Sequence, residues 1–234
     1  MIKLSKRLLQ VASYIPDNCH LVDIGCDHAY LDIYLYQNRK NIHIIASDIN
    51  EKALSSAKTN IAKFKLTDKI ETRVGSGLEN IKEGEIDTIT MSGLGSHTIV
   101  GILYNNRSKL KNVNQIVIQS NTSLEFLRSK VTKLGYYIQD EKLVKEGKIF
   151  YTIINFQKGR KRYSKKELYF GPILLKENSK LFNEKNQEDL TKLEILMKII
   201  PKNHYHLRLK THFKIKTLKK LLKNSTCQTK QNMV

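Results

Sequence analysis

The sequence predicts an α/β fold, a Rossmann-like open sheet that is parallel except for one antiparallel strand, followed by an antiparallel helical hairpin. Three observations predict it. Apolar runs typical of strands alternate with helix-like stretches through residues 1–157. Two β-rich segments, 136–144 and 149–157, follow each other across a short polar joint, which is typical of a β-hairpin. Beyond residue 172 the pattern changes to two helix-like stretches separated by Pro201.

The elements of the sheet follow in order from the spacing of apolar residues. Residues 3–15 carry apolar side chains at helical spacing, and Pro16 ends that helix. Asn50 is placed to cap a helix, and Thr122 with Glu125 has the spacing of a capping box. The expected strands are 20–25, 42–48, 71–74, 87–91 and 115–121. The expected helices between them are 29–38, 50–64, 97–104 and 122–135.

Composition divides the chain into four parts. We expect a sheet domain over 1–157, a basic linker over 158–172, a helical hairpin over 173–223 and a disordered tail over 224–234. In the hairpin, one helix repeats apolar residues at heptad spacing and the other has a looser stripe. The first stripe is Leu190, Leu193, Met197 and Ile200, and the second is Leu207, Phe213, Leu218, Leu221 and Leu222.

The first strand leads into a turn built on Gly25, and the second strand ends at Asp48, an arrangement typical of the nucleotide-binding half of a doubly wound fold. A dinucleotide pyrophosphate needs further glycines in that turn, but Asp27 and Ala29 stand there and Asp23 precedes it. Carboxylates would repel a phosphate and suit a cation. S-adenosylmethionine carries a sulfonium and an ammonium but no phosphate, and its ribose diol suits Asp48. The turn therefore predicts an enzyme, a class I S-adenosylmethionine-dependent methyltransferase, with its cofactor-binding domain at 1–157.

The cofactor should lie at the carboxyl ends of the strands, where ligands bind in open α/β sheets. Gly25 lets the backbone approach the ligand closely, while Asp48 accepts the ribose hydroxyls and Ile49 packs on the adenine. Asp23 or Asp27 takes the ammonium group. The full set of expected cofactor-binding residues is Asp23, Gly25, Cys26, Asp27, His28, Asp48, Ile49, Gly75, Ser76, Gly77, Ser92 and Gly93.

Composition excludes several other classes of protein. Cys19, Cys26 and Cys227 are odd in number and widely spaced, so neither a disulfide framework nor a zinc site is predicted, and we expect no metal. No apolar run approaches the roughly 20 residues that span a bilayer, and the N-terminus lacks a signal-peptide core. We therefore expect a cytoplasmic protein without a membrane partner. We also expect a monomer, although nothing in the composition determines the oligomeric state.

Positive charge is concentrated in the last third of the chain. Residues 157–234 carry a net charge of +14, out of +19 for the whole chain. Such an excess favours binding to a polyanion, most simply a nucleic acid whose phosphates pair with lysine and arginine. The expected RNA-binding residues are Lys158, Arg160, Lys161, Arg162, Lys165, Lys166, Lys214, Lys216, Lys219 and Lys220.

The same positions carry a resemblance to a known family, the bacterial tRNA adenine-22 N1-methyltransferases, over nearly the whole chain. The most specific motif is Asp27-His-Ala-Tyr-Leu31 after the glycine turn. Further motifs are Leu4-Ser-Lys-Arg-Leu8, Tyr14-Ile-Pro16, Asp23-Ile-Gly25, Gly77-Leu78, Gly93-Leu-Gly95, Gln119-x-Asn121, Asp140-Glu141 and Gly171-Pro172. The resemblance implies methyl transfer from S-adenosylmethionine to N1 of adenosine 22 in the tRNA D-arm.

Three residues depart from the pattern of that family. Ser76 stands where the family usually has aspartate, which weakens an expected contact to the cofactor's adenine amine. Ser96 follows Gly95 where glycine is usual, and Cys26 replaces a small residue that is usually serine. We interpret Cys26 as a residue that fills the turn rather than as a nucleophile.

The chemistry of the substrate indicates what catalysis requires. N1 of adenine has a free lone pair at neutral pH, so its methylation needs placement and a polar surrounding for the developing cation rather than a general base. The catalytic candidates are Asp27, His28, Tyr30 and Asn121. Asp27 could stabilise the charge, His28 or Tyr30 could stack on the base, and Asn121 with the 92–95 loop could hold its edge.

Two other readings stay open. One is an amino-methyltransferase acting on another nucleic acid or on protein, although enzymes acting on adenine N6 carry a proline-rich loop where this chain has Ser92-Gly-Leu-Gly95. The other is a non-catalytic RNA-binding protein on a degenerate methyltransferase fold. Binding of the cofactor would separate these two readings.

Overall fold

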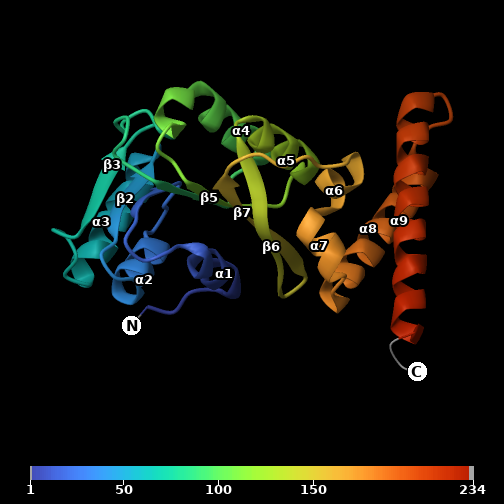
Figure 1. Cartoon of the computed structure of the whole chain (residues 1–234), viewed down its shortest axis with the longest axis horizontal. Helices are drawn as coiled ribbons and strands as arrows, with labels where there is room; N and C mark the ends of the chain where they lie inside the picture. Colours follow the sequence, from blue (N-terminus) through green and yellow to red (C-terminus); the bar gives the residue numbers. More distant parts are fainter. Residues whose placement is uncertain (1, 232–234) are drawn as a thin grey trace. The chain divides into compact units, whose positions relative to one another are not determined.

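The computed structural model describes residues 2–231, with side chains through residue 223, and divides the chain into two compact units at 175/176 (Figure 1). The first unit contains a seven-stranded sheet of order β3-β2-β1-β4-β5-β7-β6. Its strands are β1 His20–Ile24, β2 His43–Asp48, β3 Ile70–Val74, β4 Thr88–Ser92, β5 Gln115–Ser120, β6 Tyr136–Glu146 and β7 Ile149–Lys158. Its helices are α1 Lys6–Tyr14, α2 Tyr30–Asn38, α3 Glu51–Lys63, α4 Ser96–Asn105, η1 Arg107–Leu110, α5 Leu124–Lys133, α6 Lys165–Phe170 and, across the boundary, α7 Pro172–Glu177.

The pairing of the strands confirms the predicted sheet. β1 pairs in parallel with β2 and β4, and the parallel pairing continues to β3 on one side and to β5 on the other. β7 pairs antiparallel with both β5 and β6, so β7 is the one strand that runs against the rest. The chain moves outward from β1 through β2 to β3 and then crosses to β4. The carboxyl ends of β1 and β4 therefore form the topological switch point, where ligands of such sheets bind.

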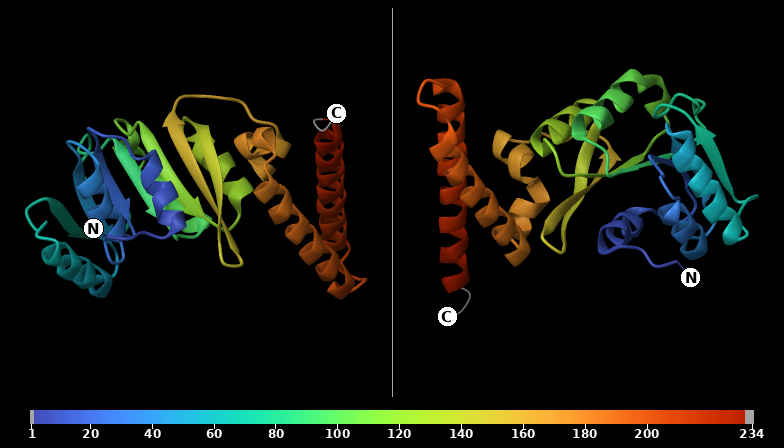
Figure 2. Two further views of the ribbon diagram at one scale, coloured as in Figure 1. Left: turned by 90° about the horizontal axis from the view of Figure 1, so that it is seen from below. Right: turned by 180° about the vertical axis from the view of Figure 1, so that it is seen from behind.

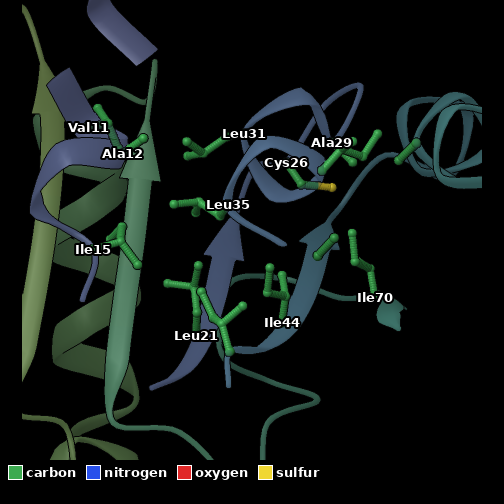
Figure 3. Close-up of a cluster of buried hydrophobic side chains, with 14 of the residues drawn as sticks. Val11, Ala12, Ile15, Leu21, Cys26, Ala29, Leu31, Leu35, Ile44 and Ile70 are labelled. Carbon is green, nitrogen blue, oxygen red and sulfur yellow. The ribbon is translucent and has the colours of Figure 1, made fainter. Parts of the chain in front are cut away.

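Helices cover both faces of the sheet, and alternate strand residues supply each face (Figures 1 and 2). On one face Leu21 and Ile44 pack with Val11 of α1 and Leu35 of α2, as Figure 3 shows. On the other face Val22 belongs to a second buried cluster with α4 and α5. Because adjacent residues of β1 anchor opposite cores, the turn that follows it is held from both sides.

One predicted helix start is wrong. Thr122 and Glu125 do not form a capping box, because the Thr122 hydroxyl accepts instead from the backbone N–H of Ser96, at 3.1 Å. Ser123 precedes α5 with φ +44° and makes no side-chain cap. Thr122 therefore ties the start of α4 to the end of β5. The predicted cap at Asn50 is confirmed, because its side chain accepts from the backbone N–H of Lys52, at 2.9 Å.

The segment 158–172, expected to be a linker, is packed onto the first unit. Ser164 and Glu167 form a capping box that starts α6. The hydroxyl of Tyr163 accepts from the N–H of Ile138 in β6, at 2.8 Å. The expected linker is corrected in two respects: it contains a helix, and the boundary between units lies after it, at 175/176.

The second unit is a pair of helices, α8 Lys180–Ile199 and α9 Tyr205–Gln231, separated by Pro201 as predicted. They pack against each other (Figure 2). Leu190 and Ile200 of the predicted α8 stripe are buried. The predicted α9 stripe is confirmed at Leu218 and Leu221, which are buried together with Thr211, but it is wrong at Leu207 and Phe213, which are exposed.

The predicted disordered tail is corrected over most of its length. α9 continues to Gln231, because residues 224–231 include no glycine or proline that would end a helix. Residues 232–234 lie outside the described part of the chain. No helix in that described part is both long enough and apolar enough to cross a membrane.

Candidate functional site

A cavity of about 530 Å³ opens at the carboxyl ends of β1, β2 and β4, at the switch point of the sheet. Every residue predicted to bind the cofactor lines it: Asp23, Gly25, Cys26, Asp27, His28, Asp48, Ile49, Gly75, Ser76, Gly77, Ser92 and Gly93. Sequence reasoning missed other lining residues, among them Arg7 from α1 and Thr98 and Ile102 from α4. Their chain positions gave no signal, because they reach the cavity only through helix packing.

The turn after β1 has a conformation that brings backbone close to the cavity. Gly25 adopts φ +80°, and a Cβ atom there would lie 3.4 Å from the Leu94 side chain. The N–H groups of Gly25 and Cys26 both donate to the carbonyl of Ser47, at 2.8 and 3.1 Å. Asp27 and Ala29 also have positive φ, which is uncommon outside glycine and concentrates at functional sites. The turn is thus fixed to β2 and held in a strained shape.

Asp48 is oriented by two backbone donors. Its Oδ1 accepts from the N–H of Asn50 at 2.8 Å, and its Oδ2 accepts from the N–H of Asp27 at 3.2 Å. Each carboxylate oxygen keeps acceptor capacity for a further hydrogen bond. Two adjacent oxygens that face the cavity in a fixed orientation are suited to the two hydroxyls of a ribose. Ile49 beside it is 70% exposed and offers an apolar surface to a flat ring.

Asp23 lies beneath the cavity next to a second buried carboxyl, Asp32 of α2, which sequence reasoning missed. The two residues are 3% and 0% exposed. No donor of the described residues reaches Oδ1 of Asp23 or either oxygen of Asp32, and the two carboxyls can hydrogen-bond each other only when one of them is protonated. Burial, together with the nearby charge of Asp32, raises the pKa of Asp23 well above its ordinary value. Burial likewise raises the pKa of Asp32. A cationic group in the cavity would supply the missing partner, so the site fits a ligand with an ammonium.

Cys26 and the Ser76 turn complete the walls of the cavity. Burial raises the pKa of the Cys26 thiol, which therefore stays protonated, in agreement with its interpretation as a turn-filling residue. The backbone N–H of Ser76 donates to Glu79 at 3.3 Å. Gly77 has φ +63°, and a Cβ atom there would lie 2.6 Å from Ile102. Only glycine fits at that position.

The catalytic candidates of the first turn lie at the mouth of the cavity. Nε2 of His28 is 3.7 Å from Oδ1 of Asp27, and both side chains are exposed, at 49% and 72%. The rings of His28 and Tyr30 stack with their centroids 5.6 Å apart. An exposed pair of stacked rings beside a carboxylate can receive a flat base and face a developing positive charge.

Asn121, the fourth catalytic candidate, lines a smaller neighbouring cavity of about 190 Å³. This cavity also contains Gln119, Thr122 and Tyr151, and it shares Arg7, Gly93 and Leu94 with the larger one. The two cavities therefore adjoin along the loop after β4. Two ligands that must react with each other could be held side by side there.

The predicted RNA-binding residues differ in exposure and in whether their charged groups already have a partner within the chain. The Lys158 ammonium donates to the carbonyls of Leu110 and Lys111, so it closes a turn rather than facing solvent freely. Lys219 pairs with Glu194 across the helix pair, at 2.7 Å. The remaining exposed members are Arg160, Lys161, Arg162, Lys165, Lys166, Lys216 and Lys220, whereas Lys214 is half-buried. Among the residues that the structure describes, no group of three or more metal-binding side chains occurs.

Comparison with known proteins places these features in a family. Residues 21–223 match the family described as TrmK, tRNA (adenine(22)-N(1))-methyltransferase. The Bacillus subtilis protein of that description is 35% identical over 195 residues, which cover 81% of this chain and 82% of the relative.

Solved structures agree with that match. A Streptococcus pneumoniae structure, described as a putative tRNA (m1A22) methyltransferase in complex with S-adenosyl-L-methionine, has 33% identity and a TM-score of 0.87, covering 94% of this chain and 100% of that one. A structure described as M. capricolum TrmK in complex with S-adenosyl-homocysteine has 34% identity and a TM-score of 0.83, covering 94% of this chain and 98% of that one.

Proposed function

The chain belongs to the tRNA (adenine(22)-N(1))-methyltransferase family, and we propose that it transfers a methyl group from S-adenosylmethionine to N1 of adenosine 22 in the tRNA D-arm. The observation that carries the proposal is the charge of the larger cavity. Asp23, Asp27 and Asp48 line it, and Arg7 is the one lysine or arginine among its described lining residues. Such a cavity suits a cationic, phosphate-free nucleoside and disfavours a dinucleotide.

Each part of the cofactor has a complementary group in the cavity. Asp48, whose carboxylate is oriented by two backbone donors, would hold the ribose hydroxyls, and Ile49 with the 75–77 turn would hold the adenine. Asp23, whose Oδ1 is reached by no donor of the described residues, would hold the ammonium group. When bound, S-adenosylmethionine supplies an electrophilic methyl group carried by a sulfonium.

The protein supplies placement on the acceptor side. Adenine N1 attacks with its own lone pair, so no residue needs to remove a proton before the new bond forms. Asp27 stabilises the positive charge that develops on the ring, and the His28–Tyr30 stack supports the base. Asn121 and the loop after β4 hold the base edge from the smaller cavity. Because N1 lies on the pairing edge, a paired target must first be exposed.

Transfer RNA is held by the exposed basic residues through its phosphates, with an affinity that falls as salt rises. The exposed candidates are Arg160, Lys161, Arg162, Lys165, Lys166, Lys216 and Lys220. Lys158 and Lys219 contribute less, because each already has a partner. We further propose that the enzyme acts in the cytoplasm, where tRNA is processed, and as a monomer.

The proposal is tested with labelled S-adenosylmethionine and unmodified tRNA transcripts, followed by identification of the methylated nucleoside and its position. We expect 1-methyladenosine at position 22, and its loss in Asp48→Ala. Asp68→Ala is the matched control, because Asp68 is exposed and lines a separate cavity near the starts of the strands. Methylation of another nucleoside would overturn the proposed substrate but not the proposed cofactor. Absence of both transfer and cofactor binding would instead favour a non-catalytic RNA-binding protein.

A further inference from the structure

The side chain of Gln119, at the end of β5, is held by three hydrogen-bond donors. Its Oε1 accepts from Nη1 of Arg7 at 2.6 Å, from the N–H of Gly93 at 3.1 Å and from Oγ of Ser92 at 3.3 Å. A guanidinium and a backbone N–H can only donate, so they fix which end of the Gln119 amide is the oxygen. Gln119 is also buried, at 2% exposure, and cannot turn over without losing these bonds.

The fixed orientation of the Gln119 amide determines the orientation of the Asn121 amide. The Nε2 group of Gln119 donates to Oδ1 of Asn121 at 3.2 Å. Asn121 must therefore present its oxygen on that side, with one acceptor lone pair remaining, and its Nδ2 on the other. Asn121 is exposed at the smaller cavity, and its Nδ2 has no hydrogen bond in the described part of the chain. The result is an oriented acceptor and donor pair that faces the space for a substrate.

Arg7 begins this chain of hydrogen bonds, which runs from Arg7 through Gln119 to Asn121 and is called the relay below. It comes from α1, far in sequence from β5, and it lines both cavities. Its backbone N–H donates to Glu146 at 2.6 Å, and its guanidinium lies over the Tyr151 ring, 5.3 Å from the centroid. These contacts from β6 and β7 hold Arg7 in place. Neither Arg7 nor Gln119 was predicted as a site residue.

An oriented amide matches one edge of adenine. Asparagine recognises adenine through two hydrogen bonds, in which its oxygen accepts from N6–H and its nitrogen donates to N7. This edge leaves N1 free. Guanine presents an oxygen acceptor in place of the N6 donor, so the same amide orientation would oppose it.

We propose that Asn121 reads the N6/N7 edge of the target adenine, and that Arg7 and Gln119 are positioning residues that set its amide orientation. This inference rests on the proposed function. It adds the basis of base selection, and it explains why N1 is left available for the methyl group. Arg7 and Gln119 act through Asn121 and need not touch the base.

The test uses tRNA in which only the target adenosine is replaced. 7-Deazaadenosine removes the N7 acceptor, and purine riboside removes the N6 amine, while both keep N1. We expect the protein to favour adenosine over 7-deazaadenosine by about tenfold in kcat/KM, the size of one buried hydrogen bond. The preference over purine riboside should be similar.

Three variants locate the origin of that preference. Asn121→Ala should lower both preferences by about tenfold relative to the unchanged protein, leaving the intrinsic difference in N1 reactivity of the analogues. Asn121 is exposed, so the variant should fold. Gln119→Glu keeps the acceptor for Arg7 but cannot donate to Asn121, so it too should lose the preferences while its Kd for S-adenosylhomocysteine is unchanged. Asn38→Ala is the control, an exposed asparagine on α2 whose amide bonds only its own helix, through the Tyr34 carbonyl.

The possible outcomes separate this inference from the proposed function. Failure to methylate unmodified tRNA at all would refute the proposed function. Methylation of adenosine and 7-deazaadenosine at equal rates would refute only the reading by Asn121. Full preference retained in Gln119→Glu would refute the relay.

Discussion

Two pairs of ionisable side chains are buried in the first unit, Arg128–Glu141 and Asp23–Asp32, and they differ in how their hydrogen bonds are satisfied. Arg128 and Glu141 are 1% and 0% exposed, with Nε and Oε1 2.6 Å apart. Arg128 also donates to the carbonyls of Leu168 and Tyr169, and Glu141 accepts from the N–H of Ile173, so the pair fastens the segment after β7. The Asp23–Asp32 pair is as deeply buried, but it joins two carboxyls, and no donor of the described residues reaches three of its four oxygens.

This difference in hydrogen bonding distinguishes buried ionisable groups that stabilise the fold from those that bind a ligand. A buried ion pair with complete hydrogen bonding is compensated within the chain. Two carboxyls side by side are not, and the free protein must leave at least one of them protonated. Asp23 of the uncompensated pair lines the cavity in which a ligand cation is expected. We interpret it as a site that the cofactor's ammonium completes.

The largest expected effect is on the satisfied pair. Arg128→Leu leaves the Glu141 carboxylate buried without its cation, and breaking a buried pair in this way costs about 3–5 kcal/mol. The free energy of unfolding, measured by urea denaturation, should fall by that amount. Lys185→Ala is the control, because its partly exposed pair with Asp189 is worth under about 1 kcal/mol. A loss in Arg128→Leu as small as that of the control would contradict the structural role.

The next effect is on cofactor affinity. Asp23→Asn removes the negative charge that faces the ammonium, and we expect the Kd for S-adenosylhomocysteine to rise roughly a hundredfold, the value of a charge-assisted hydrogen bond. Calorimetric titration measures it. Asp17→Asn provides a control aspartate outside the cavity, where no change is expected. An unchanged Kd in Asp23→Asn would place the ammonium elsewhere.

A smaller effect is expected on stability in the absence of cofactor. Burial raises the pKa of Asp32 to about 7, so the folded chain keeps a proton that the unfolded carboxyl releases above its ordinary pKa. Stability from this source is present at low pH and is lost as the pH rises toward 7. Asp32→Asn should therefore flatten the pH dependence and raise the unfolding free energy at pH 8 by on the order of 1–2 kcal/mol. If the unfolding free energy had the same slope against pH in the unchanged protein and in Asp32→Asn, the Asp23–Asp32 pair would not be the source of the pH dependence.

The smallest effect concerns the departure at Ser76. Ser76→Asp restores the residue that is usual in the family and adds an acceptor for the cofactor's adenine amine. We expect the Kd for S-adenosylhomocysteine to fall about threefold to tenfold, within the range of one hydrogen bond. Ser13→Asp, on the exposed part of α1, controls for added charge. A weaker affinity in Ser76→Asp would show that Glu79, whose carboxylate already accepts from the Ser76 N–H, repels the new charge.

The sequence predicted those parts of the site that lie close together along the chain. Gly25, Asp27 and Asp48 follow from strand ends and turn chemistry, which act over a few residues. Asp32 could not be predicted, because an aspartate in the first turn of a helix is common and nothing local shows that α2 packs it against Asp23. Arg7 was missed for the same reason, since its site depends on how α1 crosses the ends of β4 and β5.

Packing also explains the predictions of secondary structure that failed. Thr122 has the right spacing for a capping box, but a contact with Ser96 takes its hydroxyl. In α9 the apolar residues fit more than one stripe, and packing against α8 buries Thr211 rather than Phe213. Lys158 has the charge of a phosphate-binding residue, yet its ammonium donates hydrogen bonds to the carbonyls of Leu110 and Lys111. Each outcome was decided by a partner distant in sequence.

The most direct test of the central claim is the number of protons released when S-adenosylhomocysteine binds. Titration calorimetry at pH 6.5 in buffers of different ionisation enthalpy measures that number. If the ammonium completes the Asp23–Asp32 pair, binding should release close to one proton, and Asp32→Asn should release far fewer. Binding without proton release, and with the same Kd from pH 6 to 8, would contradict the account.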